Sequence, residues 1–295
     1  MHGQNVAMPC RLTAKTDRDG PTGGAATPLL ETVFVRGGSF MFGRCSMLDP
    51  AGGTQKAVDG FHIGRFQVTQ AQWRAVMGNN PSFFDGTNAW IDGAETGADT
   101  TFDRNSLPVE MVSWYDALVF ANRLSAIDGL QPAYRIKDST DPGNWGKVPA
   151  NDSEHWDAVE IAEGADGWRL PTRHQWEFAA KGGGLSGNAG TDIAGHSYLV
   201  FSGSDAATEV AWHGANSRGR THPVGIMAPN ALGLCDMSGN VSEWVWDRWL
   251  ATSTRRVMVG GSWSVAANNV RTVSIALPVG NNNGTRTRGF RLVRH

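Results

Sequence analysis

Three short helices that share one N-terminal signature, separated by long irregular stretches, constrain the fold of this chain most strongly. In each signature a Thr or Ser is followed three positions later by Gln or Asp, with a Trp close by (69–73, 113–116 and 172–176). The hydroxyl can accept a hydrogen bond from the amide three residues on, while the side chain at that position bonds back to the amide of the hydroxyl residue. The apolar spacing that follows predicts helices over 69–78, 113–126 and 172–181.

The stretches between these helices are rich in Gly, Asn and Asp and far exceed ordinary loop lengths, which indicates functional loops or short strands within them (79–106, 126–165 and 182–225). Strand-like runs lie near the two ends of the chain. Residues 31–35 and 38–43 flank a Gly-Gly pair and predict a hairpin, and three later runs predict further strands (241–246, 257–263 and 290–293). Helices grouped early with strands at both ends favour an α+β fold over an alternating α/β order.

Two regions differ in their organisation. Residues 1–30 are polar and show no periodicity, so we expect a flexible N-terminal arm. No later stretch has the composition of a linker, so residues 31–295 are expected to form a single domain.

The composition excludes several classes of protein. The 295 residues are 40% hydrophobic and 18% charged, with a net charge of −2. Such a chain can fill a core, which argues against disorder, and it has no basic excess for binding nucleic acid. No run of about 18 apolar residues is present to form a transmembrane segment. The first 30 residues show no signal peptide.

Two motifs that often carry chemistry do not do so here. Cys10, Cys45 and Cys235 form no CxxC pair, and we expect three free thiols with no shared role. Residues 182–187 match GxGxxG but follow a predicted helix, so they are expected to end that helix and not to bind a dinucleotide.

The turn at 236–244 has two interpretations. Two carboxylates and an Asn surround Gly239, and together with backbone oxygens they could supply ligands to Ca²⁺. Alternatively, the turn is purely structural, and Asn240 and Glu243 bond backbone amides. The spacing leaves both open.

The segment 264–288 has an unusual composition. It contains no Lys, Glu, Gln, Met or Trp, and it lies between two rigid-looking pieces, Gly260-Gly261-Ser262-Trp263 and 289–293. Its apolar run 273–279 could form a buried strand, but Pro278 argues against a central one.

Several motifs in one order identify a family resemblance. They include Phe34 to Phe40, Pro108 to Trp114, Trp168 to Thr172, Asp236 to Trp244, the Gly-Gly-Ser-Trp run and Gly289-Phe290-Arg291. Over residues 31–295 the chain resembles the sulfatase-modifying-factor, or formylglycine-generating enzyme, family. This resemblance implies an α+β C-type-lectin-like fold of that subtype, loop-rich, with short antiparallel strands and about three helices.

The resemblance also bears on catalysis and metals. The family's enzymes use two cysteines downstream of the Gly-Gly-Ser-aromatic motif, and the corresponding positions are Val265 and Val270. Valine offers no thiolate, so we expect no enzyme activity of this kind and no required cofactor. A calcium site of the family maps onto Asp236, the backbone of Gly239 and Val241, and Glu243, which makes a structural Ca²⁺ an expectation to examine.

One branch with this fold accounts for the odd composition of 264–288. In the variable proteins of diversity-generating retroelements, mutagenesis targets adenines, often in AAC or AAT codons. Changing the first two bases of such codons cannot yield the five missing residue types. The predicted ligand-binding residues are therefore Ser264, Val265, Ala266, Ser274, Ile275, Leu277, Val279, Asn281, Asn283, Thr285 and Thr287. On this interpretation the apolar members are partly exposed contacts and not core.

The resemblance then implies a non-enzymatic display protein that binds a protein or cell-surface ligand and no nucleic acid. It implies a monomer at the bacterial cell surface or outside the cell. The alternative is a catalytically inactive, or differently catalytic, relative of the enzyme that acts as an accessory or structural domain.

Overall fold

The helices begin where the capping signatures place them. The computed structural model describes residues 29–43, 53–87, 103–183, 199–275, 280–281 and 284–295. Its three longer helices are α1 (Gln70–Met77), α3 (Trp114–Ile127) and α5 (Arg173–Ala180), each preceded by a complete capping box. The described parts of the long stretches add the one-turn helices α4 (Glu154–Asp157) and α6 (Ala207–Val210) and two 3-10 turns (104–106 and 142–144), and a further 3-10 turn lies at 267–269.

The N-terminal strands do not form the predicted hairpin. β1 (Thr32–Val35) pairs with β4 (Phe61–Gly64), whereas β2 (Gly38–Phe42) pairs with β3 (Thr54–Val58). Gly37 lies between the two sheets, and a Cβ there would come within 2.8 Å of the Val58 carbonyl oxygen. The chain therefore passes from one sheet to the other at Gly37 and does not turn back on itself.

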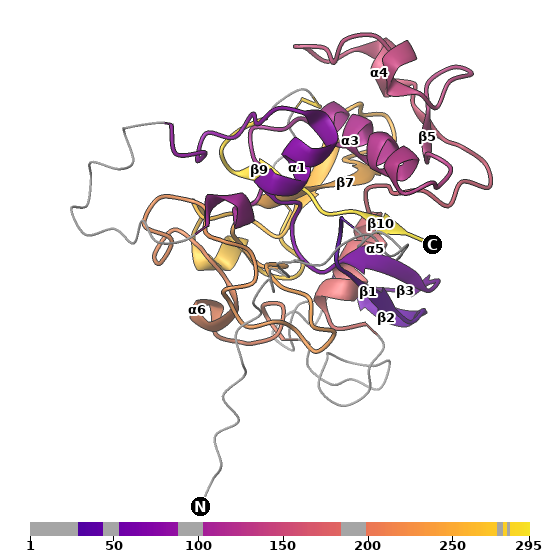
Figure 1. The fold of residues 1–295 in the computed structure, drawn as a ribbon. Helices are drawn as coiled ribbons and strands as arrows, with labels where there is room; N and C mark the ends of the chain where they lie inside the picture. Colours follow the sequence, from indigo (N-terminus) through magenta and orange to yellow (C-terminus); the bar gives the residue numbers. More distant parts are fainter. Residues whose placement is uncertain (1–28, 44–52, 88–102, 184–198, 276–279, 282–283) are drawn as a thin grey trace, which may run out of the picture.

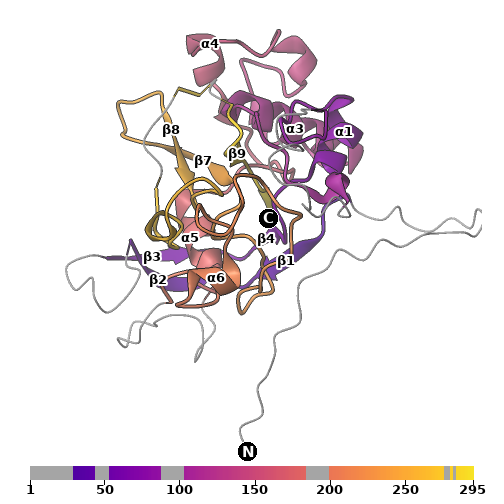
Figure 2. The same cartoon turned by 90° about the vertical axis from the view of Figure 1, so that its left-hand side faces the viewer.

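A second, C-terminal sheet has the order β8–β7–β9, and the three strands lie side by side in Figure 2. β7 (Ser242–Arg248) pairs antiparallel with β8 (Arg256–Val259) and parallel with the two-residue β9 (Arg288–Gly289). The last strand, β10 (Val293–Arg294), returns to β4, and β5 (Tyr134–Arg135) pairs with β6 (Glu160–Ile161). Apart from β7–β9, the paired strands are antiparallel, so the α+β expectation is confirmed for the described residues.

Two large apolar clusters form the core. The first surrounds α3, which packs beside α1 in Figure 1 and buries ten of its fourteen residues; Trp114, Phe120 and Phe290 belong to this cluster. The second surrounds α5, which contacts both the β2–β3 pair and β7. β7 contributes Trp244 to one cluster and Val245 to the other, so this strand joins the two halves of the core.

Two smaller expectations have different outcomes. Gly182 and Gly183 take positive φ values of 86° and 69° directly after α5, as helix-ending glycines do, while 184–187 lie outside the described residues. Cys235 is disulfide-bonded, so the expectation of a free thiol is wrong for this residue; Cys10 and Cys45 lie outside the described part. No described helix is long and apolar enough to cross a membrane.

Candidate functional site

A cleft of about 450 Å³ opens over the C-terminal sheet. It is lined by Ser242, Met258, Gly261, Ser262, Ser264, Val265, Asn269, Ser274, Ile275, Thr287 and Arg288. The first two residues belong to β7 and β8, and most of the others belong to the composition-biased segment or its flanks. The cleft therefore combines a floor of regular strands with walls of irregular chain.

The Gly-Gly-Ser-Trp run shapes one wall. Gly260 and Gly261 take positive φ values of 82° and 67°, and a Cβ on Gly261 would lie 2.2 Å from the Asn269 carbonyl oxygen. Only glycine allows this approach. The indole nitrogen of Trp263 donates to the Arg286 carbonyl at 2.9 Å, which ties the start of the segment to its end.

The opposite wall is held by the parallel pairing of β9 with β7. This register places Arg288 beside Ser242, and the Ser242 amide donates to the Thr287 carbonyl at 2.8 Å. Burial lowers the pKa of the Arg288 guanidinium from its ordinary value. Among the described residues that line the cleft, Arg288 is the one side chain with a formal charge, and its guanidinium also lies over the Trp244 ring.

The structure brings together five of the residues that the sequence predicts to bind ligand. Ser264, Val265, Ser274, Ile275 and Thr287 all line the cleft. Two further predicted residues lie in the described part but not among the lining residues: Ala266 is exposed and Thr285 is half-buried. Leu277, Val279 and Asn283 lie outside the described residues.

Asn281 is wrongly predicted as a displayed side chain. It is fully buried, and its amide nitrogen donates to the Asp157 carboxylate at 2.6 Å and to the Thr254 carbonyl at 2.8 Å. Its side-chain oxygen accepts from the Arg256 amide at 3.0 Å. Every polar atom of the Asn281 side chain has a partner within the protein. Asn281 therefore anchors the segment to the β7–β8 hairpin and is not available to a ligand.

Sequence reasoning missed six lining residues: Ser242, Met258, Gly261, Ser262, Asn269 and Arg288. Three of them lie within or next to the two flanking motifs, which are a usable signal because the flanks of a displayed segment must border its site. Ser242 and Met258 carry no such signal, since only the pairing of β7 with β8 and β9 brings them under the cleft.

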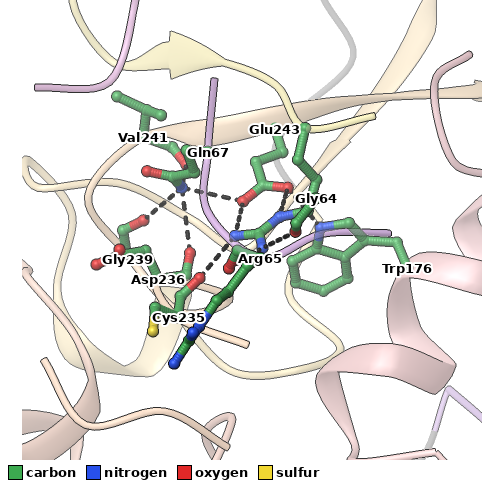
Figure 3. Close-up of polar contacts among 10 residues, drawn as sticks. Gly64, Arg65, Gln67, Trp176, Cys235, Asp236, Gly239, Val241 and Glu243 are labelled. Atoms are coloured by element: carbon green, nitrogen blue, oxygen red, sulfur yellow. Dashed lines mark hydrogen bonds and ion pairs between the residues drawn. The ribbon is translucent and has the colours of Figure 1, made fainter. Parts of the chain in front are cut away.

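Below the cleft floor, a polar network surrounds Gln67 (Figure 3). The Gln67 amide nitrogen donates to the carbonyls of Asp236, Gly239 and Val241 at 3.1, 3.3 and 2.9 Å. It also donates to Oε1 of Glu243 at 3.0 Å. Four oxygens from a single turn thus converge on one neutral donor.

Glu243 has further partners in the same network. Arg291 donates to both of its oxygens at 2.8 Å, and the Trp176 indole donates to Oε2 at 2.7 Å. The guanidinium also donates to the carbonyls of Gly64, Arg65 and Cys235. Both charged side chains are essentially inaccessible to solvent, at 0% and 1% exposure. The pair is therefore a fully hydrogen-bonded buried ion pair.

A domain family known as the sulfatase-modifying factor enzyme 1-like domain matches residues 21–295. The chain belongs to this family. The Chaperone protein LppX of Paenibacillus barcinonensis is 36% identical over 280 residues, which cover 87% of this chain and 86% of that protein.

Two solved structures share the fold along most of this family member's length. Treponema denticola variable protein 1 superimposes with a TM-score of 0.73 at 28% identity, covering 89% of this chain and 94% of that one. The protein CarF superimposes with a TM-score of 0.66 at 29% identity, covering 90% and 98%. The C-type-lectin-like interpretation of the sequence is thereby confirmed.

Thiolate chemistry of the kind that the resemblance implies for the family's enzymes does not fit Val265 and Val270, the residues at the corresponding positions of this chain. Val270 is fully buried with Phe201, Val210 and Ala211, and Val265 packs against the same apolar cluster. A thiolate-binding metal has no ligand in a pair of valines. No chemical step at these two positions can be assigned.

Proposed function

We propose that this chain is a non-enzymatic binding protein that captures a polypeptide ligand in the cleft above the C-terminal sheet. The observation that carries the proposal is the grouping of Ser264, Val265, Ser274, Ile275 and Thr287 around one cleft. These residues were predicted from the biased composition of 264–288 and from the family resemblance, before any cleft was known, and their meeting at one cleft supports the proposal.

The chemistry of the lining argues against catalysis. The described lining residues offer hydroxyls, one amide and one guanidinium, and the site has no carboxylate, imidazole or thiol. A general base or an activated nucleophile needs a titratable neighbour at hydrogen-bonding distance. A site of this composition is suited to binding, and we infer that the chain acts without chemistry.

The same lining indicates the type of ligand. A cationic Arg288 among several Ser and Thr hydroxyls suits a carboxylate, because guanidinium-to-carboxylate hydrogen bonds are stronger than neutral ones. Val265, Ile275 and Met258 add apolar area beside it. We therefore infer a polypeptide segment that presents an acidic side chain or a C-terminal carboxylate next to an apolar residue.

A rigid scaffold would allow the side chains in the walls of the cleft to differ in sequence without loss of the fold. The exposed or half-buried side chains at 264–275 and 284–288 project from a floor that the buried network and the core clusters hold in place. Binding surfaces of this kind gain affinity from exchanged side chains on a pre-organised frame. The missing residue types in 264–288 support diversification by a retroelement, and we infer a monomer at the bacterial surface or outside the cell.

The binding test uses a random peptide library with free C-termini, selected on the immobilised full chain. Ser274→Trp fills the cleft and should weaken binding of a selected peptide at least about tenfold, or 1.4 kcal/mol. The control is Thr252→Trp, because Thr252 is exposed in the β7–β8 turn and does not line the cleft. Equal binding by the two variants, or no enrichment at all, contradicts the proposal.

Diversification has a separate test in DNA. A near-copy of the DNA encoding 260–293, differing mainly at adenines and lying beside a reverse-transcriptase gene, is the expected finding. If the chromosome holds no such copy, the proposal of diversification by a retroelement is refuted. The proposal of peptide binding does not depend on this result.

An accessory role is the second candidate, favoured by the similarity to a protein named as a chaperone over most of both chains. In that case the cleft would hold a segment of one client protein. Selected peptides would then converge on one sequence found in a neighbouring gene product, whereas a variable binder has no such fixed match.

A further inference from the structure

Gln67 places a neutral hydrogen-bond donor where the family resemblance assigns calcium (Figure 3). We propose that the Gln67 amide replaces a structural calcium ion in this chain, so that the platform beneath the cleft folds without a metal. The proposal concerns the scaffold, and it stands whether or not the cleft binds a peptide.

The geometry of the four oxygens matches a nitrogen donor. They lie 2.9–3.3 Å from the amide nitrogen, whereas Ca²⁺ takes six to eight oxygens at about 2.3–2.6 Å. Of the Asp236 side chain, one of the predicted ligands, Oδ2 accepts from the Gly225 amide at 2.7 Å, while Oδ1 is buried and has no hydrogen-bond partner among the described residues. The turn contributes the backbone oxygen of Asp236 instead.

The charges match a neutral donor as well. Glu243 is the carboxylate that contacts the centre, and Arg291 already neutralises it through two hydrogen bonds. A dication placed beside this buried guanidinium would be repelled where solvent screening is weak. The two hydrogens of the Gln67 amide are shared among the four oxygens and add no charge.

The network bears directly on the cleft. Successive side chains of a strand point to opposite faces, and on β7 Ser242 lines the cleft while the next residue, Glu243, belongs to the Gln67 network. The hydrogen bonds of Gln67 therefore hold β7, and with it the floor of the cleft, in position. Changes in calcium concentration should leave the geometry of the walls unchanged.

The first test measures the melting temperature and calcium binding of the unmodified full chain. The melting temperature in EDTA and in millimolar CaCl2 should agree within about 1 °C, because a ligand that does not bind the folded state cannot stabilise it. Equilibrium dialysis with radioactive calcium should show no stoichiometric binding. One bound ion per chain, with a rise of several degrees, overturns the proposal.

The second test converts the donor into an acceptor. Gln67→Glu places a fifth oxygen among four others, so it should lower the melting temperature in EDTA. Calcium should then raise it by about 5–11 °C at a concentration one hundred times the dissociation constant. The matched control is Gln72→Glu, since Gln72 lies five residues away and its side-chain oxygen acts as an acceptor in the α1 capping box.

The two variants separate the outcomes. A calcium response confined to Gln67→Glu supports the proposal, and an equal response of both variants refutes it. If Gln67→Glu does not fold in EDTA but folds in calcium, the proposal is supported; if calcium does not rescue it, the measurements on the unmodified chain decide.

Discussion

Replacing Arg291 with Met should destabilise the protein more than almost any other single change, because it leaves a buried carboxylate without its counter-charge. The Met side chain fills the space of the aliphatic stem, so the loss is mainly electrostatic. Glu243 would keep its bonds from Gln67 and Trp176 but lose both bonds from the guanidinium. Three backbone carbonyls would lose a donor as well.

The size of the effect follows from the burial of the pair. Breaking a buried ion pair by removing one partner costs about 3–5 kcal/mol. At roughly 2–4 °C per kcal/mol, the melting temperature should fall by about 6–20 °C. Urea unfolding followed by tryptophan fluorescence measures the free energy, since Trp176 and Trp244 both lie in the core.

Two further variants test the reasoning behind this value. Arg135→Met removes an exposed pair with Glu160 and should leave the urea midpoint unchanged, because solvent screens such pairs. Adding Glu243→Gln to Arg291→Met removes the stranded charge and should recover part of the lost stability. A single variant within about 1 kcal/mol of the wild type, or a double variant with no recovery, would refute the electrostatic argument.

Three other changes have defined outcomes. Asn281→Ala should cost about 2 kcal/mol in urea unfolding, because the buried Asp157 carboxylate, the Thr254 carbonyl and the Arg256 amide each lose a hydrogen-bond partner; an unchanged urea midpoint would mean that the segment is not anchored there. Burial raises the pKa of Glu110 to about 7, so the folded state holds this proton at a pH where the unfolded state has released it, and stability should decline as pH rises from about 4.5 to 7. Glu110→Gln should remove that decline. In paired urea curves, the variant's free energy of unfolding should rise relative to that of the wild type by about 3 kcal/mol between pH 4 and pH 8, and parallel pH profiles would contradict the argument. Ser264→Trp should keep the melting temperature within about 2 °C, since Ser264 is exposed; a large fall would show that the wall is part of the core.

The local elements were largely predictable from sequence because their causes are local. A capping hydroxyl and its partner three residues later lie within one turn, so the N-cap residues of α1, α3 and α5 were correctly predicted and each helix begins one residue after its predicted start. Strand pairing was less predictable, since β1 selects β4 through contacts with a partner some thirty residues away. The hairpin expectation failed for this reason.

The candidate site was likewise predictable in part, where its causes are local in the sequence. Composition and flanking motifs identified the segment whose side chains form the walls, and five of its predicted residues meet at the cleft. The burial of Asn281 had no local signal, because its partners belong to α4 and to the β7–β8 hairpin. The cleft floor was equally unpredictable from the sequence, since it forms only when β7 pairs with β8 on one side and β9 on the other.

By itself, the sequence determined the family, the helix starts, the absence of thiols at Val265 and Val270, and the segment available for binding. These follow from residue identity and short spacing. Only the tertiary structure decided which residues of that segment are accessible and what lies at the centre of the 236–243 turn. Gln67 lies about 170 residues from the oxygens it bonds, and a contact of that kind is determined by packing and not by any local pattern.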